Sequence, residues 1–163
     1  MGELDEPLTK IYVDLPEHWA TGGESMWALP LGGDLYEIRN TPFYAYDLNF
    51  LDVVRAVAPS PDVKPHVLAV VRRGGHETLR IFFNETIQDA RRIAILDALD
   101  RFGVSYEGCS PRYFALDVTP GSSVAQLRAH LDELEKDDVL SYETTEARVP
   151  GSFDDRPDDD TGR

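Results

Sequence analysis

The sequence predicts an α+β protein in which a small all-β unit is followed by a unit of alternating strands and helices. Two observations carry this prediction. Apolar residues recur with the period of strands over residues 10–72, and the spacing typical of helices begins only after residue 85. Short meandering strands bury one face by curving, so we expect a small β-barrel-like or curved antiparallel sheet over residues 1–75. We expect it to pack on a ferredoxin-like unit over residues 76–149.

Five short runs in the first unit have the alternation and the β-branched content of strands. They are residues 10–15, 25–31, 35–39, 51–57 and 67–72. Gly32-Gly33-Asp34 joins the second run to the third as a hairpin, because glycine supplies the positive φ that tight turns require. Pro42 has no N–H to donate and biases Thr41 to an extended conformation, so the third strand ends before it.

The second unit reads β-α-β-β-α-β, with strands expected at residues 78–83, 104–107, 112–118 and 139–146. The first helix is predicted to open at Thr86, in a capping box with Asp89, and to end at Gly103. The second opens at the capping box Ser123–Gln126. This order is the ferredoxin-like arrangement, with both helices on one face of an antiparallel sheet. Residues 150–163 have no periodicity and several aspartates, which predicts a disordered acidic tail.

Composition excludes several classes of partner. The chain has 16 Lys and Arg against 30 Asp and Glu, a net charge of −14. No segment is basic, so we expect neither nucleic acid nor a membrane surface as a partner. The acidic excess favours solubility and is suited to steering a basic protein partner. The N-terminal segment is acidic and no apolar run approaches the ~20 residues of a membrane helix, which favours a cytoplasmic protein.

Several short motifs recur in an order and spacing that resemble a known family. They are Trp27, Tyr36, Asn40-Thr41-Pro42-Phe43, Asp52-Val53-Val54 and Gly75-His76-x-Thr78-x-Arg80. Together they resemble the bacterial domain-of-unknown-function family numbered 4265, over residues 11–148. The chain departs from the family pattern at Leu51, where glycine often precedes the aspartate. The resemblance implies no activity, substrate or cofactor.

A row of polar residues is the first candidate site. His76, Thr78 and Arg80 are two residues apart on a predicted strand, so their side chains point to one face. An imidazole, a hydroxyl and a guanidinium in a row can hold a carboxylate or a phosphate. In the structural alternative, which we favour, Arg80 pairs with an acid such as Asp52 and His76 caps the Gly74-Gly75 turn. Asp52 itself is expected to form a turn more readily than to act as a catalytic carboxylate.

Aromatic residues form the second candidate site. Phe43, Tyr44, Tyr46 and Phe50 lie close together in the sequence. Exposed, they would form a recognition surface, and buried, they would be core; we favour burial of Phe43 and Phe50 and keep Tyr46 as a binding candidate. Trp19 is the better surface candidate because it lies in a predicted loop.

We expect no cofactor and no metal. The four histidines show no ligand spacing, there is no glycine-rich phosphate loop, and the single cysteine, Cys109, has no histidine near it in sequence. The favoured hypothesis is therefore a non-catalytic binding protein, in an immunity-like or antitoxin-like form, that engages a protein partner. The alternative is a sensor or enzyme with a small-molecule site at the junction of the two units, lined by His76, Arg80, Tyr46 and Asp52.

Overall fold

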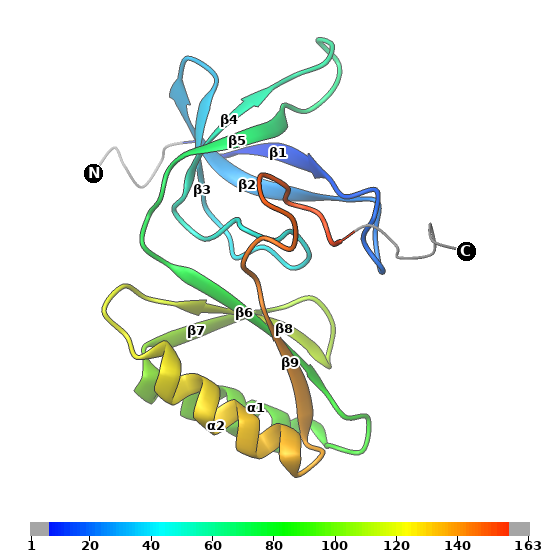
Figure 1. Cartoon of the computed structure of the whole chain (residues 1–163), viewed down its shortest axis with the longest axis vertical. Coiled ribbons are helices and arrows are strands. Elements are labelled where there is room, and N and C mark those ends of the chain that lie inside the picture. The colour runs from blue at the N-terminus through cyan, green and yellow to red at the C-terminus, as the bar shows by residue number, and fades with distance from the viewer. Residues whose placement is uncertain (1–6, 157–163) are drawn as a thin grey trace. The chain divides into compact units, whose positions relative to one another are not determined.

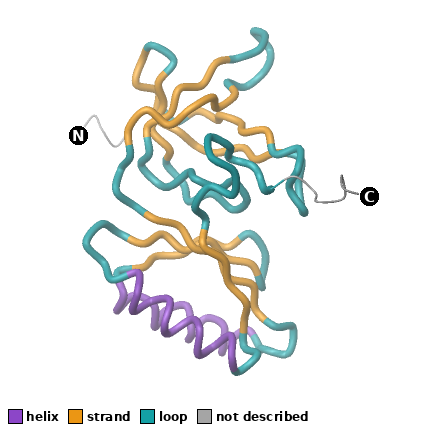
Figure 2. Tube along the Cα trace, viewed as in Figure 1, coloured by secondary structure: helices purple, strands orange, loops and turns teal. Residues whose placement is uncertain are grey.

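The computed structural model describes residues 7–156, which form two compact units. The first unit contains the residues up to Gly74 together with those from Thr145 onward, and the second is Gly75–Thr144. The predicted boundary at residue 149 needs correction, because the chain returns to the first unit at Thr145. Helices occur only in the second unit over the described residues (Figure 2).

The first unit is a closed five-stranded barrel (Figure 1). Its strands are β1 (Thr9–Asp14), β2 (Gly23–Gly32), β3 (Leu35–Ile38), β4 (Val53–Val57) and β5 (His66–Arg72). Successive strands pair antiparallel, and β1 closes the barrel by pairing parallel with β5 at Tyr12 and His66. Of the two predicted forms, a barrel or a curved sheet, the structure therefore has the barrel.

Alternation along the strands fills the barrel interior with apolar side chains. Buried members come from every strand and include Ile11, Val13, Met26, Ala28, Ile38, Val54, Ala56 and Val67. Ala45 and Leu48, from the loop between β3 and β4, join the same core. This loop, residues 39–52, is therefore part of the barrel core and not a free connection.

The segment after Thr144 also packs on the barrel. The N–H of Asp47 donates to the carbonyl of Thr145 (2.7 Å), and the N–H of Tyr46 donates to that of Phe153 (2.8 Å). Phe153 packs against the barrel core and Asp154 is buried. The predicted disordered tail is therefore corrected over residues 150–156, and residues 157–163 lie outside the described part.

The second unit is a four-stranded antiparallel sheet with two helices on one face (Figure 1). Its elements are β6 (Glu77–Phe83), α1 (Asp89–Ala98) with the 3-10 turn η2 (Leu99–Phe102), β7 (Val104–Gly108), β8 (Tyr113–Val118), α2 (Val124–Lys136) and β9 (Leu140–Thr144). The order across the sheet is β7-β8-β6-β9. Leu79, Ile81 and Phe83 of β6 face the helices and form the core with them.

Of the two predicted capping boxes, the second is present in its serine half. Ser123 caps α2 by accepting the N–H of Gln126 at 3.2 Å. The prediction for Thr86 is wrong, since Gln88 is the N-cap of α1 and makes no side-chain capping bond. The backbone N–H and hydroxyl of Thr86 instead donate to Asn84 Oδ1, because an asparagine two residues earlier offers a closer acceptor.

Within residues 7–156, the helices are too short and too polar for any of them to span a lipid bilayer.

Candidate functional site

The loop between β3 and β4 is anchored by a buried carboxylate. Glu24 lies on the inward face of β2, in alternation with Met26 and Ala28. Its carboxylate accepts three consecutive backbone N–H groups, from Phe43 at 2.6 Å and from the next two residues at 3.0 and 2.9 Å. Successive N–H groups of this kind form an anion-binding concavity, and here the chain fills it with its own side chain. Sequence reasoning missed Glu24, although an acid at an inward position of the alternation was the available signal.

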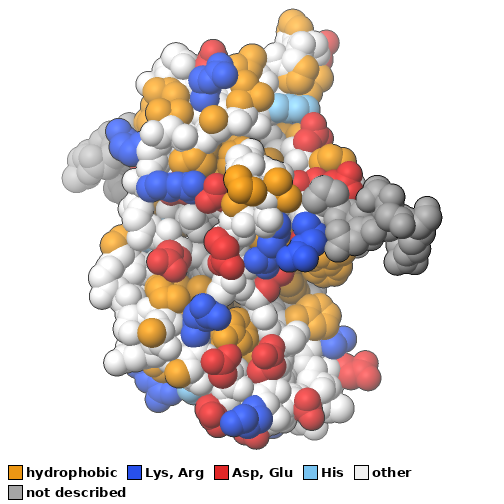
Figure 3. Space-filling model, viewed as in Figure 1, with side chains coloured by type: hydrophobic (Ala, Val, Ile, Leu, Met, Phe, Trp, Pro, Cys, Tyr) orange, Lys and Arg blue, Asp and Glu red, His pale blue; other side chains and the backbone are white. Residues whose placement is uncertain are grey.

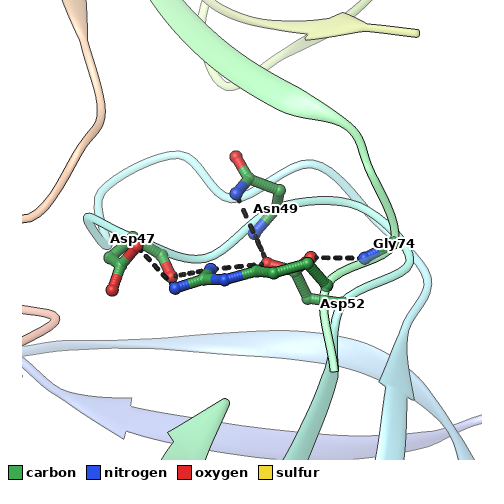
Figure 4. A network of polar contacts seen from close by, with 5 residues as sticks. Asp47, Asn49, Asp52 and Gly74 are labelled. Atoms are coloured by element: carbon green, nitrogen blue, oxygen red, sulfur yellow. Dashed lines mark hydrogen bonds and ion pairs between the residues drawn. The ribbon is translucent and has the colours of Figure 1, made fainter. Parts of the chain in front are cut away.

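A second buried carboxylate, Asp52, holds the end of the same loop (Figure 4). Asp52 Oδ1 accepts the N–H of Gly74 at 2.9 Å, and Oδ2 accepts the N–H of Asn49 and Arg73 Nη1, both at 3.0 Å. Arg73 also contacts Asp47 at 2.7 Å. Every one of these partners belongs to the first unit, so Asp52 acts as a loop-closing residue. This agrees with the turn role expected from sequence.

The departure from the family pattern at Leu51 has a backbone explanation. Leu51 has φ of 69°, in the left-handed region that favours glycine. The Asp52 network and the bond from the N–H of Leu51 to the carbonyl of Ile38 (2.8 Å) hold this conformation. These hydrogen bonds stabilise Leu51 in a backbone conformation that glycine would adopt without strain.

Aromatic side chains from two distant segments, and an arginine from a third, meet on the first unit. The ring of His18 lies 5.2 Å from Trp19, 5.3 Å from Tyr44 and 6.2 Å from Tyr46. The guanidinium of Arg148 lies 4.4 Å from the ring centre of Tyr46. We call His18, Trp19, Tyr44, Tyr46 and Arg148 the aromatic cluster. It brings together two of the predicted site residues, Trp19 and Tyr46, and adds two that sequence reasoning did not select, His18 and Arg148.

The members of the aromatic cluster differ in exposure. Tyr46 is buried, and Tyr44 is half-buried, as are the nearby Phe43 and Phe50. Trp19 is 65% exposed. The surface position expected for Trp19 is therefore confirmed, while Tyr46 serves as part of its support.

The loop that carries Trp19 is fixed on both sides. The N–H of Leu15 donates to the carbonyl of Gly22 at 3.0 Å and closes the loop. The N–H of Glu17 donates to Asp154 Oδ2 at 2.7 Å, and the N–H of Ala20 donates to His18 Nδ1 at 2.9 Å. The segment after Thr144 thus helps to hold the loop, and an exposed indole is presented on an ordered backbone.

The predicted polar row lies in the second unit, on the sheet face away from the helices. Thr78 and Arg80 are both buried on β6. In register, Thr78 is opposite Asp117 and Arg80 is opposite Glu143. Arg80 Nε donates to Glu143 Oε2 at 3.0 Å. Arg80 thus pairs with an acid as expected, but the acid is Glu143 and not Asp52, whose guanidinium partner is Arg73.

His76 belongs to the same row through its contact with Asp117. Its Nδ1 lies 2.7 Å from Asp117 Oδ1, so it contacts a side chain of β8. Burial raises the pKa of the Asp117 carboxyl, and the contact with His76 opposes part of that rise. Carboxylates of β8 and β9 thus contact His76 and Arg80 of the row. Among the described residues, no group of three or more histidine, cysteine or acidic side chains is placed to hold a metal ion.

These features define an α+β protein made of a closed five-stranded barrel and a four-stranded sheet that carries two helices. The chain belongs to the family described as domain of unknown function (DUF4265), whose profile matches residues 24–142. It is similar in fold to the crystal structure of a hypothetical protein from Neisseria gonorrhoeae, with a TM-score of 0.72 and 16% sequence identity, over 86% of this chain and 95% of that one. A search of curated proteins found no match.

Proposed function

We propose that the protein is a non-catalytic binding protein that engages a protein partner through Trp19. The observation that carries this proposal is the 65% exposure of an indole on a loop whose backbone is held by hydrogen bonds at both ends and to Asp154. Tryptophan is the residue type most enriched among the hot spots of protein interfaces. An anchor that is already ordered loses little conformational entropy when it binds.

The charge of the chain supports a basic partner. Acidic and basic side chains are interspersed on the face shown in Figure 3, so the excess acid does not gather into one patch there. A net charge of −14 nonetheless attracts a positively charged protein over distances near the Debye length. Net charge would then speed the encounter, and Trp19 would supply the short-range contact. An immunity-like or antitoxin-like inhibitor of a basic protein is one concrete form of this role.

The alternative, a small-molecule site at His76, Thr78 and Arg80, has weaker support. The ring of His76 and the guanidinium of Arg80 both contact carboxylates of neighbouring strands, and Arg80 and Thr78 are buried. An anionic ligand would have to displace Glu143 or Asp117 from these contacts. A structural role for the row is therefore the simpler interpretation.

Two finer assignments belong with this proposal. We assign the second unit to the ferredoxin-like arrangement, which is supported by its β-α-β-β-α-β element order and its β7-β8-β6-β9 sheet order. We also propose a cytoplasmic location in a bacterium, which the single cysteine and the acidic composition support.

The experiment is affinity capture with the full chain followed by binding to the purified partner. Wild type, Trp19→Ser and the control Trp27→Ser are compared, since Trp27 is also exposed but lies on β2. We expect one protein to be retained by wild type and Trp27→Ser, with an affinity at least ~10-fold lower for Trp19→Ser. Rising salt should slow its association. A partner that binds wild type and Trp19→Ser equally well would refute the assignment of the anchor.

A further inference from the structure

A cavity of about 250 Å³ lies in the second unit between α1 and the β7–β8 hairpin. One helical face of α1 and one end of the hairpin line it, through Arg92, Ile93, Leu96, Tyr106 and Phe114. Ile93 is 54% exposed and Tyr106 is also exposed, so apolar surface at the mouth is open to solvent. The rings of Tyr106 and Phe114 meet edge to face at 5.9 Å. The cavity is thus a mainly apolar pocket with a defined aromatic wall.

One cation lines this pocket. Arg92 is buried, and its guanidinium donates to the carbonyl of Ile87 and to Asp89. These contacts use two of the five N–H groups that a guanidinium carries. The side chain of Asp89 is 83% exposed, so it can turn into solvent and release Arg92 to another carboxylate. The N-terminus of α1, where Gln88 makes no side-chain capping bond, adds positive potential on the same side.

We propose that this pocket binds a small monocarboxylic acid with an apolar body. The carboxylate replaces Asp89 on Arg92, in the geometry that guanidinium groups favour. The apolar body lies against Ile93, Tyr106 and Phe114. The volume is below the range of pockets for drug-sized ligands, which restricts the ligand to about the size of one ring with a short side chain. A phosphate dianion is disfavoured, because the apolar walls cannot replace its hydration.

The test is a titration of the full chain with phenylacetate and, separately, with phenylacetamide, followed by amide NMR shifts. The two probes have nearly the same shape, and only the first carries a charge. We expect saturable shifts for phenylacetate at Ile93, Tyr106 and Phe114, and affinity for phenylacetamide lower by about tenfold or more, since a charge-assisted bond is lost. Equal affinity for the two probes, or no saturable shift with phenylacetate, overturns the proposal.

A matched pair of variants locates the binding. Ile93→Trp fills the mouth of the pocket, whereas Ala94→Trp adds the same bulk at the next exposed position of α1, which does not line it. Both changes are at exposed positions, so the fold is retained, and the dispersion of the same spectra verifies it. We expect phenylacetate binding to be lost in Ile93→Trp and kept in Ala94→Trp. Binding that survives in Ile93→Trp places the probe elsewhere and refutes the site.

Discussion

Asp52→Asn tests whether the buried carboxylate network stabilises the barrel unit. Both oxygens of Asp52 accept hydrogen bonds, one from Gly74 and the other from Asn49 and Arg73 (Figure 4). Asparagine offers one accepting oxygen and one NH₂ group, so in either orientation a donor faces a donor. The substitution keeps the size of the side chain and changes only this pattern and the charge.

The expected loss follows from the contacts. If the amide oxygen takes the place of Oδ2, the N–H of Gly74 loses its acceptor at a cost of about 1–3 kcal/mol. The bonds that remain lose their charge assistance, which costs about 1 kcal/mol more. Arg73 keeps the amide oxygen as its acceptor and is 48% exposed, so losing the ion pair adds little to this cost. We therefore expect the free energy of unfolding to fall by about 3 kcal/mol.

Urea unfolding followed by tryptophan fluorescence measures this loss, because Trp19 and Trp27, the two tryptophans of the chain, belong to the first unit. Asp47→Asn is the matched control, since Asp47 contacts the same guanidinium from a position that is 31% exposed. We expect it to cost less than about 1 kcal/mol. If the free energy of unfolding falls equally in the two variants, or by less than about 0.5 kcal/mol in Asp52→Asn, the buried carboxylate does not stabilise the first unit.

Three further predictions concern other buried or half-buried polar groups. Glu24→Gln should lower the free energy of unfolding by about 2 kcal/mol, because the NH₂ group of the glutamine would face the N–H of Phe43. Hydrogen exchange of the backbone amides should become faster at residues 43–45, which donate to Glu24 in the wild type. Unchanged exchange at these residues would contradict the anchoring role. Arg80→Met should lower the free energy of unfolding by about 3 kcal/mol. This is at the low end for breaking a buried ion pair, because Glu143 is partly exposed. A melting temperature equal to that of the wild type would show that the fold does not need Arg80. The pKa of His130 is lowered, mainly by burial and also by the charge of Arg101. Below about pH 6.5 the unfolded chain therefore binds more protons at this residue than the folded chain does. The free energy of unfolding should then fall as the pH drops through that value. His130→Gln removes this contribution, so the stability difference between about pH 7.5 and about pH 5 should shrink, and a difference that stays the same or grows would reverse the assigned sign.

Local pattern was enough to predict most elements of the fold. The alternation of apolar residues located the five barrel strands, and helical spacing located α1 and α2, because both periods follow from backbone geometry. The Ser123 cap was predicted for the same local reason. The prediction of a cap at Thr86 was wrong because Thr86 donates its N–H and hydroxyl to Asn84. A sequence motif does not show which of two nearby side chains a residue will bond.

Part of the candidate site was also visible in the sequence. Trp19 was recognised from its place in a predicted loop, and the common face of Thr78 and Arg80 followed from strand alternation. Their partners were not predictable. Glu143 is 63 residues from Arg80, and Asp117 is 41 residues from His76, so only strand register brings them together.

By itself, the sequence determined the class of fold, the family, the acidic charge and the exposed tryptophan, since each depends on composition, on residue type or on a short-range period. Only the tertiary structure decided which carboxylates hold which donors, how residues 145–156 return to support the Trp19 loop, and where the pocket beside α1 lies. The physical reason is that these features join groups far apart in the chain. Their contacts form only after the strands have paired, and no local period of the sequence encodes them.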